Sequence, residues 1–266
     1  MCKAIIISSP TIDVIEINEK RITSAGGPPL FMGFALKKIG CDVNFYGPIG
    51  KKTMKTVKLQ EKIGVKTLGE QQENEGAIFL HKYDNGKRFT LFTGNIKSIN
   101  VGNLVNIINK MENDFIIVSP INNEYPIDKL SILKKPLVLD SQGYSRTIKE
   151  WYNKLPDSYL DLMHLSNDDE PESILNRLKN KSEYILYTVG LKNTIIINKE
   201  KIIKIKPKGN PVKDMTGAGD IITGLVSYFL FYKKYDIKLS YAQSEELFEE
   251  IINEISEIKL KVNEVQ

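Results

Sequence analysis

The chain has 266 residues, and 37 Lys and Arg residues against 33 Asp and Glu residues give it a net charge of +4. With 41% apolar and 26% charged residues, the composition is typical of a globular protein and excludes a disordered or fibrous one. Lys and Glu alternate along the chain, so this small positive charge does not favour a nucleic-acid partner. The longest apolar stretch, 221–232, contains Thr, Gly and Ser and is too short for a membrane span.

The chain has two cysteines, Cys2 and Cys41. Because two cysteines cannot build a disulfide framework, we expect Cys41 to be a packed thiol and Cys2 a terminal one. The apolar run at 4–7 is too short for a signal peptide. Together these features predict a reducing, cytoplasmic location.

The N-terminal part of the chain alternates short apolar segments with longer helical ones, the pattern of a mainly parallel sheet. Pro28 and Pro29 suit the first turn of a helix, and Gly40 is placed to end it. The elements predicted here are strands at 3–8, 12–17 and 42–46 and helices at 28–39 and 52–63.

A β-hairpin is predicted next, because Asp84-Asn85-Gly86 is a strong turn signal between two strand-like segments, 77–83 and 87–92. A hairpin that interrupts a series of strands and helices is usually an insertion outside the main sheet. It could serve as a lid, a dimer contact or decoration.

The alternation then resumes. The predicted elements are helices at 100–111, 126–133, 146–153 and 171–179 and strands at 115–118, 137–139, 160–165, 184–188, 194–198 and 201–206. A further helix begins near Gly217, and 228–266, which lacks Gly and Pro, is expected to form one or two amphipathic helices. We therefore expect one α/β domain over 1–266: a three-layer, mainly parallel sheet with helices on both faces, plus the hairpin.

Segment 214–220, Asp-Met-Thr-Gly-Ala-Gly-Asp, is the densest cluster of residues suited to chemistry. Its glycines let backbone amides approach a ligand, and a helix beginning there adds unpaired donors and the positive end of its dipole, which suit an anion. An acid in the first turn, Asp220, makes sense where a hydroxyl must lose its proton beside an incoming phosphoryl group. The alternative is an ordinary helix start with an acidic dipole partner.

Two segments at opposite ends of the chain resemble motifs of the ribokinase-like (PfkB) carbohydrate kinases. Residues 214–224, DMTGAGDIITG, are similar to the family's C-terminal motif. Residues 25–50 resemble its N-terminal motif, a Gly-Gly turn, a helix ending in Ile-Gly, a strand and Gly-Pro-Ile-Gly. The resemblance extends over most of the chain and implies a ribokinase-like fold whose lid is made from 12–23 and 77–92.

The resemblance implies roles for the residues of the C-terminal motif. Asp220 matches the base that receives the proton of the acceptor hydroxyl. The backbone amides of Gly217, Ala218 and Gly219 match the anion hole that neutralises the transferring phosphoryl group.

The resemblance also implies a substrate side. Asp13 matches the family's sugar-hydroxyl ligand, although from the residues alone it is an acid at a strand start and would be placed at the surface. Gly26 and Gly27 would let the backbone approach the substrate, or simply form a turn before a helix. Arg146, in a segment resembling one whose Arg reaches phosphate or substrate, and Arg88, on the hairpin, are further substrate candidates.

On the nucleotide side, Asn167 and Glu170 resemble the family's N-x-x-E motif, which organises the water shell of the nucleotide's Mg²⁺. Hard oxygen ligands and retained waters suit Mg²⁺. The alternative is a helix cap that needs no metal. Thr188 and Gly190 resemble the turn on the nucleotide side.

The resemblance implies only part of a binding site for a monovalent cation. Asp214 and Thr216 match two ligands of a cation site seen in many members. The metal candidates of this chain are therefore Asp214, for the monovalent cation, and Glu170, for the Mg²⁺ of the nucleotide. The loop that completes the cation site and helps cover adenine has no counterpart after Gly224, and 266 residues is short for the family.

We therefore predict an ATP- and Mg²⁺-dependent cytoplasmic kinase of a small sugar, polyol, cyclitol or nucleoside, with no nucleic-acid or membrane partner. Pro28 stands where the family usually has Asn, and Lys51 follows Gly50 where an Asp is common, which favours an inositol-like polyol or a nucleoside. Lid hairpins of this family often pair between subunits, so a homodimer is expected. Two rivals stay open: a weak or inactive binding or regulatory protein on the same fold, and a dinucleotide-dependent oxidoreductase, whose fingerprint would need a third glycine at Ile222.

Overall fold

The computed structural model describes residues 1–17, 20–84, 87–157, 159–190, 192–199, 201–207 and 214–264. Within these residues, nine strands form the main sheet in the order β15-β14-β13-β12-β11-β10-β1-β4-β6. The pairs from β6 to β13 are parallel, whereas β13–β14 and β14–β15 are antiparallel. The strands are β1 Lys3–Ile7, β4 Asp42–Tyr46, β6 Lys66–Thr67, β10 Phe115–Val118, β11 Leu137–Asp140, β12 Leu160–Ser166, β13 Ser182–Val189, β14 Asn193–Asn198 and β15 Ile202–Ile205.

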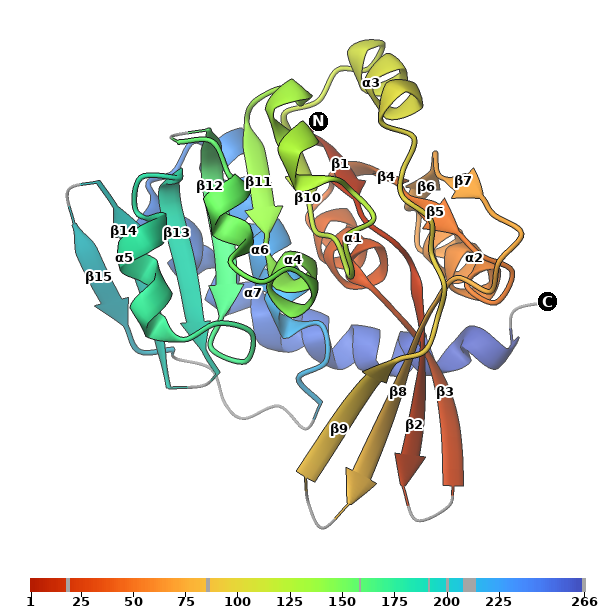
Figure 1. The fold of residues 1–266 in the computed structure, drawn as a ribbon. Coiled ribbons are helices and arrows are strands. Elements are labelled where there is room, and N and C mark those ends of the chain that lie inside the picture. Colours follow the sequence, from red (N-terminus) through yellow and green to blue (C-terminus); the bar gives the residue numbers. More distant parts are fainter. Residues whose placement is uncertain are drawn as a thin grey trace.

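Helices cover both faces of this sheet (Figure 1). Successive residues of a strand point to opposite faces, so Ile5 and Ile7 of β1 pack in one apolar cluster and Ala4 and Ile6 in another. The first cluster is closed by α3 Val101–Asn109, α4 Gln142–Thr147 and α5 Leu175–Leu178, with 3-10 turns at Ile127–Ile132, Trp151–Lys154 and Glu172–Ile174. The opposite face carries α1 Pro28–Lys38, α2 Met54–Lys62, α6 Ala218–Ser227 and α7 Ile237–Ile258, with a π-helical turn at Tyr228–Tyr232 and a 3-10 turn at Lys259–Glu264. The expected three-layer, mainly parallel α/β fold is confirmed.

A second, smaller sheet projects from one end of the main sheet (Figure 1). In the described residues it has four strands in the order β3-β2-β8-β9: β2 Thr11–Ile17, β3 Lys20–Gly26, β8 Ala77–Asp84 and β9 Lys87–Phe92. The predicted hairpin is the antiparallel pair β8–β9, and β2 joins it in parallel to β8. We call this the lid sheet; closure over a substrate stays a prediction. Two short strands, β5 Pro48–Ile49 and β7 Glu70–Gln71, form a separate parallel two-stranded sheet.

Several expectations about local structure are wrong. No continuous helix spans 146–153: α4 ends at Thr147 because Ile148 adopts an extended backbone, and a separate 3-10 turn, Trp151–Lys154, begins after Glu150, whose φ is 51°. The helix predicted at 126–133 is only a 3-10 turn, whereas the one predicted at 171–179 is present as a 3-10 turn, Glu172–Ile174, that leads directly into α5. Cys2 and Cys41 are not separate thiols, since both are buried and joined by a disulfide that links the residues immediately before β1 and β4. Among the described helices, none has the length and apolar character to cross a membrane.

Candidate active site

A cavity of about 720 Å³ lies between the lid sheet and the carboxyl ends of the central strands. Its walls come from β2, β8 and β9, from the segments that follow β10, β11 and β12, and from the N-terminus of α6. Open parallel sheets bind ligands in the crevice outside the carboxyl ends of their strands. The topology therefore places this cavity where a ligand site is expected.

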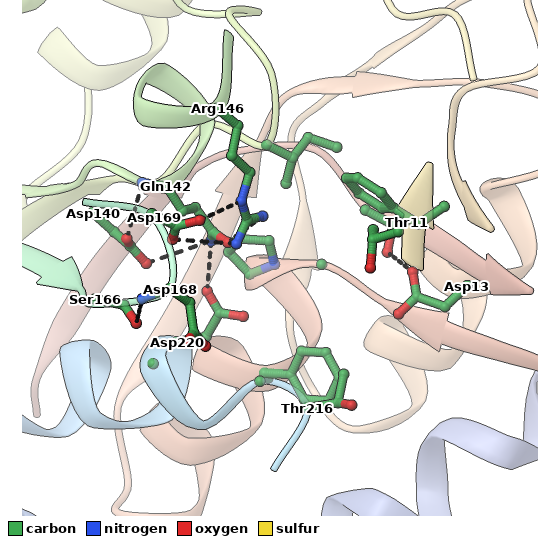
Figure 2. Close-up of a pocket in the computed structure, with 18 of the residues that line it drawn as sticks. Thr11, Asp13, Asp140, Gln142, Arg146, Ser166, Asp168, Asp169, Thr216 and Asp220 are labelled. Atoms are coloured by element: carbon green, nitrogen blue, oxygen red, sulfur yellow. Dashed lines mark hydrogen bonds and ion pairs between the residues drawn. The ribbon is translucent and has the colours of Figure 1, made fainter. Parts of the chain in front are cut away.

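Asp220 lies in the first turn of α6 at the cavity wall, and only 8% of it is exposed. Gln142, at the start of α4, donates a hydrogen bond from Nε2 to Asp220 Oδ1 at 3.2 Å (Figure 2). Burial raises the pKa of the Asp220 carboxyl well above its usual range, and the nearby charge of Asp140 raises it further. A carboxyl group with a raised pKa is suited to accept a proton near neutral pH.

The loop before Asp220 is ordered by hydrogen bonds between its own residues. Thr216 N donates to Asp214 Oδ1 at 2.9 Å, and Ala218 N donates to the carbonyl of Met215 at 3.0 Å. Gly217, the N-cap of α6, has φ 84°, and a Cβ there would lie 2.3 Å from the ring of Phe31. This position accepts only glycine without rearrangement.

The predicted anion hole lies at the cavity, because Gly217, Ala218 and Gly219 all line it, as does Thr216. The Ala218 amide, however, is already bonded within the turn. Asp214 is not among the lining residues.

Asp13 of β2 lies on the lid side of the cavity, opposite Asp140 and Asp169 (Figure 2). It is 6% exposed rather than on the surface, and its Oδ1 accepts a hydrogen bond from Thr11 Oγ1 at 2.9 Å. Gly26 makes this arrangement fit, because a Cβ there would lie 2.5 Å from Asp13 Oδ2. Gly27 lines the cavity itself, with φ 91°.

Arg146 of α4 reaches the cavity on the side of the main sheet. Its guanidinium makes two hydrogen bonds to the Asp169 carboxylate, from Nε at 2.7 Å and from Nη2 at 3.2 Å, and a third to Gln142 Oε1 at 3.2 Å (Figure 2). A planar guanidinium matches a carboxylate or a phosphate in the same two-pronged way. Arg146 is thus placed to exchange Asp169 for an anionic ligand.

Several cavity residues were not predicted as site residues, and Asp140, Gln142 and His164 are among them. His164 Nε2 lies 3.2 Å from Thr188 Oγ1, and its Nδ1 lies 3.6 Å from Asp140 Oδ1, beyond hydrogen-bond distance. The available signal was their position, since Asp140 ends β11 and His164 lies near the end of β12, the edge where parallel strands bind ligands.

Other predicted residues lie outside the cavity lining. Asn167 and Gly190 are exposed, and Glu170 Oε1 accepts a hydrogen bond from Trp151 Nε1 at 2.7 Å. Thr188 does not line the cavity, but its Oγ1 lies 3.2 Å from Nε2 of His164, which does. The backbone of Arg88 belongs to β9, but its side chain falls outside the described residues.

Magnesium would have to be held mainly by a ligand's own oxygens. The described part of the chain contains no group of three or more His, Cys, Asp or Glu side chains that could hold a metal ion. The same turn that carries Asn167 and Glu170 instead presents Asp168 and Asp169 to the cavity. Asp140 and Asp168 supply hard oxygens there, which fits Mg²⁺ bound to phosphates and retaining several waters.

No family model matches the sequence, and no curated protein matches it. Solved structures do match across nearly the whole chain. One is a pyrophosphate-dependent kinase in the ribokinase family complexed with a pyrophosphate analog and myo-inositol, 16% identical, covering 94% of this chain and 95% of that chain with a TM-score of 0.79. The chain has the ribokinase fold.

Two more solved structures with this fold are similar to the chain. A ribokinase from Thermotoga maritima is 13% identical, covers 97% of this chain and 100% of that chain, and has a TM-score of 0.75. A nucleoside kinase from Methanocaldococcus jannaschii is 15% identical, with coverages of 97% and 99% and a TM-score of 0.71. The ribokinase fold expected from the motifs at 25–50 and 214–224 is therefore confirmed.

Proposed function

We propose that this chain is a kinase that transfers a phosphoryl group to a hydroxyl of a small polyhydroxylated substrate. The observation that carries the proposal is the position of Asp220: a buried acid in the first turn of α6, in one cavity with the amides of 217–219 and with Asp13 across from them. This arrangement pairs a base for a hydroxyl with a set of donors for a phosphoryl group.

The reaction follows from these positions. Asp13 accepts a hydrogen bond from the substrate and orients it, while Asp220 accepts the proton of the reacting hydroxyl. The hydroxyl oxygen forms a bond to the phosphorus, and the bond from that phosphorus to the leaving oxygen of the donor breaks. The backbone amides at Gly217 and Gly219 and the Arg146 guanidinium stabilise the negative charge that develops. Bound Mg²⁺ would neutralise charge on the donor phosphates.

The phosphoryl donor is open between ATP, as predicted from the sequence, and pyrophosphate. Residues after Gly224 continue as helix, with Tyr228, Phe229 and Leu230 buried, and α7 begins at Ile237. The described residues thus place core packing where the resemblance expected a loop over adenine. Pyrophosphate needs no such loop, and the structures similar to this chain include pyrophosphate-dependent kinases. This favours pyrophosphate as a second candidate donor.

The direct experiment is a donor-by-acceptor screen of the purified protein. ATP and pyrophosphate are each combined with pentoses, hexoses, inositols and nucleosides in the presence of Mg²⁺, and phosphorylated product is followed by phosphorus NMR. We expect product with a cyclitol, polyol or nucleoside. Asp220→Asn is the control, because it removes the base while keeping the size of the side chain.

A binding or regulatory protein on the same fold is the rival function. Calorimetric binding of pyrophosphate or an ATP analogue without turnover on any acceptor would favour it. Binding of a nicotinamide cofactor would instead favour the alternative that the protein is a dinucleotide-dependent oxidoreductase. Absence of both turnover and binding would contradict the kinase proposal.

We also propose a homodimer through the lid sheet. Ile22 on β3 and Leu91 on β9 belong to its two edge strands and are 48% and 58% exposed. Light scattering of Ile22→Asp and Leu91→Asp variants tests it, and a wild-type monomer would contradict it. A cytoplasmic location stays a proposal, and the Cys2–Cys41 disulfide removes the cysteine argument for it.

A further inference from the structure

A buried lysine from the segment after α7 contacts the loop 214–219, which carries the predicted anion hole. Lys259, the first residue of the 3-10 turn after α7, has a side chain only 3% exposed. Its Nζ lies 2.5 Å from Asp214 Oδ2 and 5.7 Å from the centre of the Phe31 ring. Lysine is rarely buried without a partner. Here the partner of the ammonium is Asp214, which lies 45 positions earlier in the sequence.

Asp214 connects Lys259 to the backbone of the loop. Its second oxygen, Oδ1, accepts from Thr216 N, and the backbone then enters the 217–219 turn that lines the cavity. Burial raises the pKa of Asp214, but the hydrogen bonds from Lys259 and Thr216 outweigh that effect and hold it below its usual range. Phe31, under the ammonium, is the same ring that faces Gly217.

Fold stability alone does not require a charge at this position. Although Lys259 is buried, the Asp214 side chain is 40% exposed, so solvent screens part of their attraction, and such a pair is weak evidence for a purely structural role. A fixed positive charge behind an anion-binding loop, by contrast, strengthens its attraction for phosphate.

We propose that Lys259 is a positioning residue that holds the 214–219 loop through Asp214 and supplies, within the chain, the positive charge that a monovalent cation would otherwise provide there. This inference rests on the proposed phosphoryl transfer and deepens it. It implies that donor binding and turnover do not depend on added K⁺.

The test compares three variants with the wild type. Lys259→Met removes the charge but keeps the length of the side chain, and Lys259→Ala also leaves space beside Asp214. Lys261→Met is the matched control, because Lys261 lies in the same 3-10 turn and is exposed. The readouts are hydrogen exchange of the 214–220 amides and calorimetric affinity for pyrophosphate and an ATP analogue, measured in KCl and in choline chloride.

We expect faster exchange at 214–220 and about tenfold weaker donor binding in Lys259→Met, the size of effect typical for a lost charged hydrogen bond. Lys261→Met should change neither. Propylammonium, which replaces the missing part of the side chain, or K⁺ should restore binding in Lys259→Ala but not in Lys259→Met, where the space is filled. A purely structural lysine would give no such rescue.

Unchanged exchange at 214–220 in Lys259→Met would overturn the proposal, as would a wild-type donor affinity that requires K⁺. If the wild type binds no donor, the kinase proposal fails separately. In that case hydrogen exchange still decides whether Lys259 holds the loop. The second part of the inference, that the charge of Lys259 strengthens donor binding, is overturned.

Discussion

Gln142 Nε2 lies 3.2 Å from Asp220 Oδ1 and 3.5 Å from Asp140 Oδ2, so one side-chain amide bridges two buried carboxyl groups from different elements. The amide separates the two acids while leaving their charges close enough to interact. Both burial and the charge of Asp140 therefore raise the pKa of Asp220. Like charges at short range in a buried site raise a carboxyl pKa.

Asp220→Asn should lower turnover strongly and change stability with a defined pH dependence. A positioned base contributes about 10²–10⁴-fold to a rate, so we expect a loss of that size. Because the folded-state pKa of Asp220 is raised, its contribution to stability is fully present below the unfolded pKa and is lost as pH rises through the folded value. The variant should therefore be more stable than the wild type at pH 8, with the difference vanishing toward pH 4. Thermal unfolding across this range checks it, and an equal gain at pH 4 would contradict it.

Asp140→Asn should shift the pH dependence of the reaction. Removing this charge lowers the pKa of Asp220, so the rising limb of kcat/KM should move to lower pH. Asp168→Asn is the control, because Asp168 also lines the cavity but is exposed, where solvent screens its charge. Equal shifts in both variants would show that Asp140 has no special coupling to Asp220.

Asp13→Asn should weaken acceptor binding without changing donor binding. Losing a charged hydrogen bond in a buried site costs about 1.5–3 kcal/mol, so we expect the acceptor KM to rise about 10- to 100-fold. Glu16→Gln on the same strand is the control, since Glu16 pairs with Arg21 and Lys82. Steady-state kinetics with each substrate varied in turn distinguish the two, and a rise confined to the donor KM would reverse the assignment of Asp13.

The layers of the fold could be predicted from the sequence because local patterns determine them. Apolar segments such as 115–118 and 137–139 are too short for helices and became parallel strands, and Asp84-Asn85-Gly86 correctly indicated a hairpin. The prediction of a helix at 146–153 failed because Ile148 is extended and Glu150 is left-handed, and these two residues separate α4 from the next 3-10 turn. Such backbone breaks have no reliable signal at a non-glycine residue.

The site could be predicted where a motif carries it and not where only tertiary contact does. Gly217, Gly219 and Asp220 stand together in the sequence and in the cavity. Lys259 is one of many lysines in a charged tail, and nothing local distinguishes it; only the packing of α7 brings it to Asp214. The Cys2–Cys41 pair was missed for the same reason, since β1 and β4 had to be neighbours before the thiols could meet.

The disulfide should make stability depend on redox state. It closes a loop with a sequence separation of 39, and such a cross-link contributes about 2–4 kcal/mol by limiting the unfolded chain. Dithiothreitol should therefore lower Tm by about 5–10 °C, a shift consistent with a domain of this size. The Cys2→Ser/Cys41→Ser double variant should show the lower Tm with or without reductant. Two titratable thiols in the unfolded, non-reduced wild type would contradict the cross-link.

Gly217→Ala should destabilise the protein through both its backbone and Phe31. The left-handed φ of 84° costs a residue with a Cβ about 1–2 kcal/mol, and the new methyl would lie 2.3 Å from the Phe31 ring. Gly40→Ala is a matched control, because Gly40 has φ 83° and nothing within 4 Å of a new Cβ, so it should show the backbone cost alone. Denaturant unfolding should give a loss of about 3–4 kcal/mol for Gly217→Ala, as expected when overpacking adds to backbone strain.

A double-variant cycle separates these two causes. In a Phe31→Ala background, the Gly217→Ala loss should fall to the value seen at Gly40, because the ring that the methyl would meet is gone. The difference between backgrounds is then the coupling of Gly217 to Phe31, the ring on which the Lys259 ammonium also rests. A Gly217→Ala loss that is the same in both backgrounds would contradict this coupling and would mean that the loop relaxes away from Phe31 when the methyl is added.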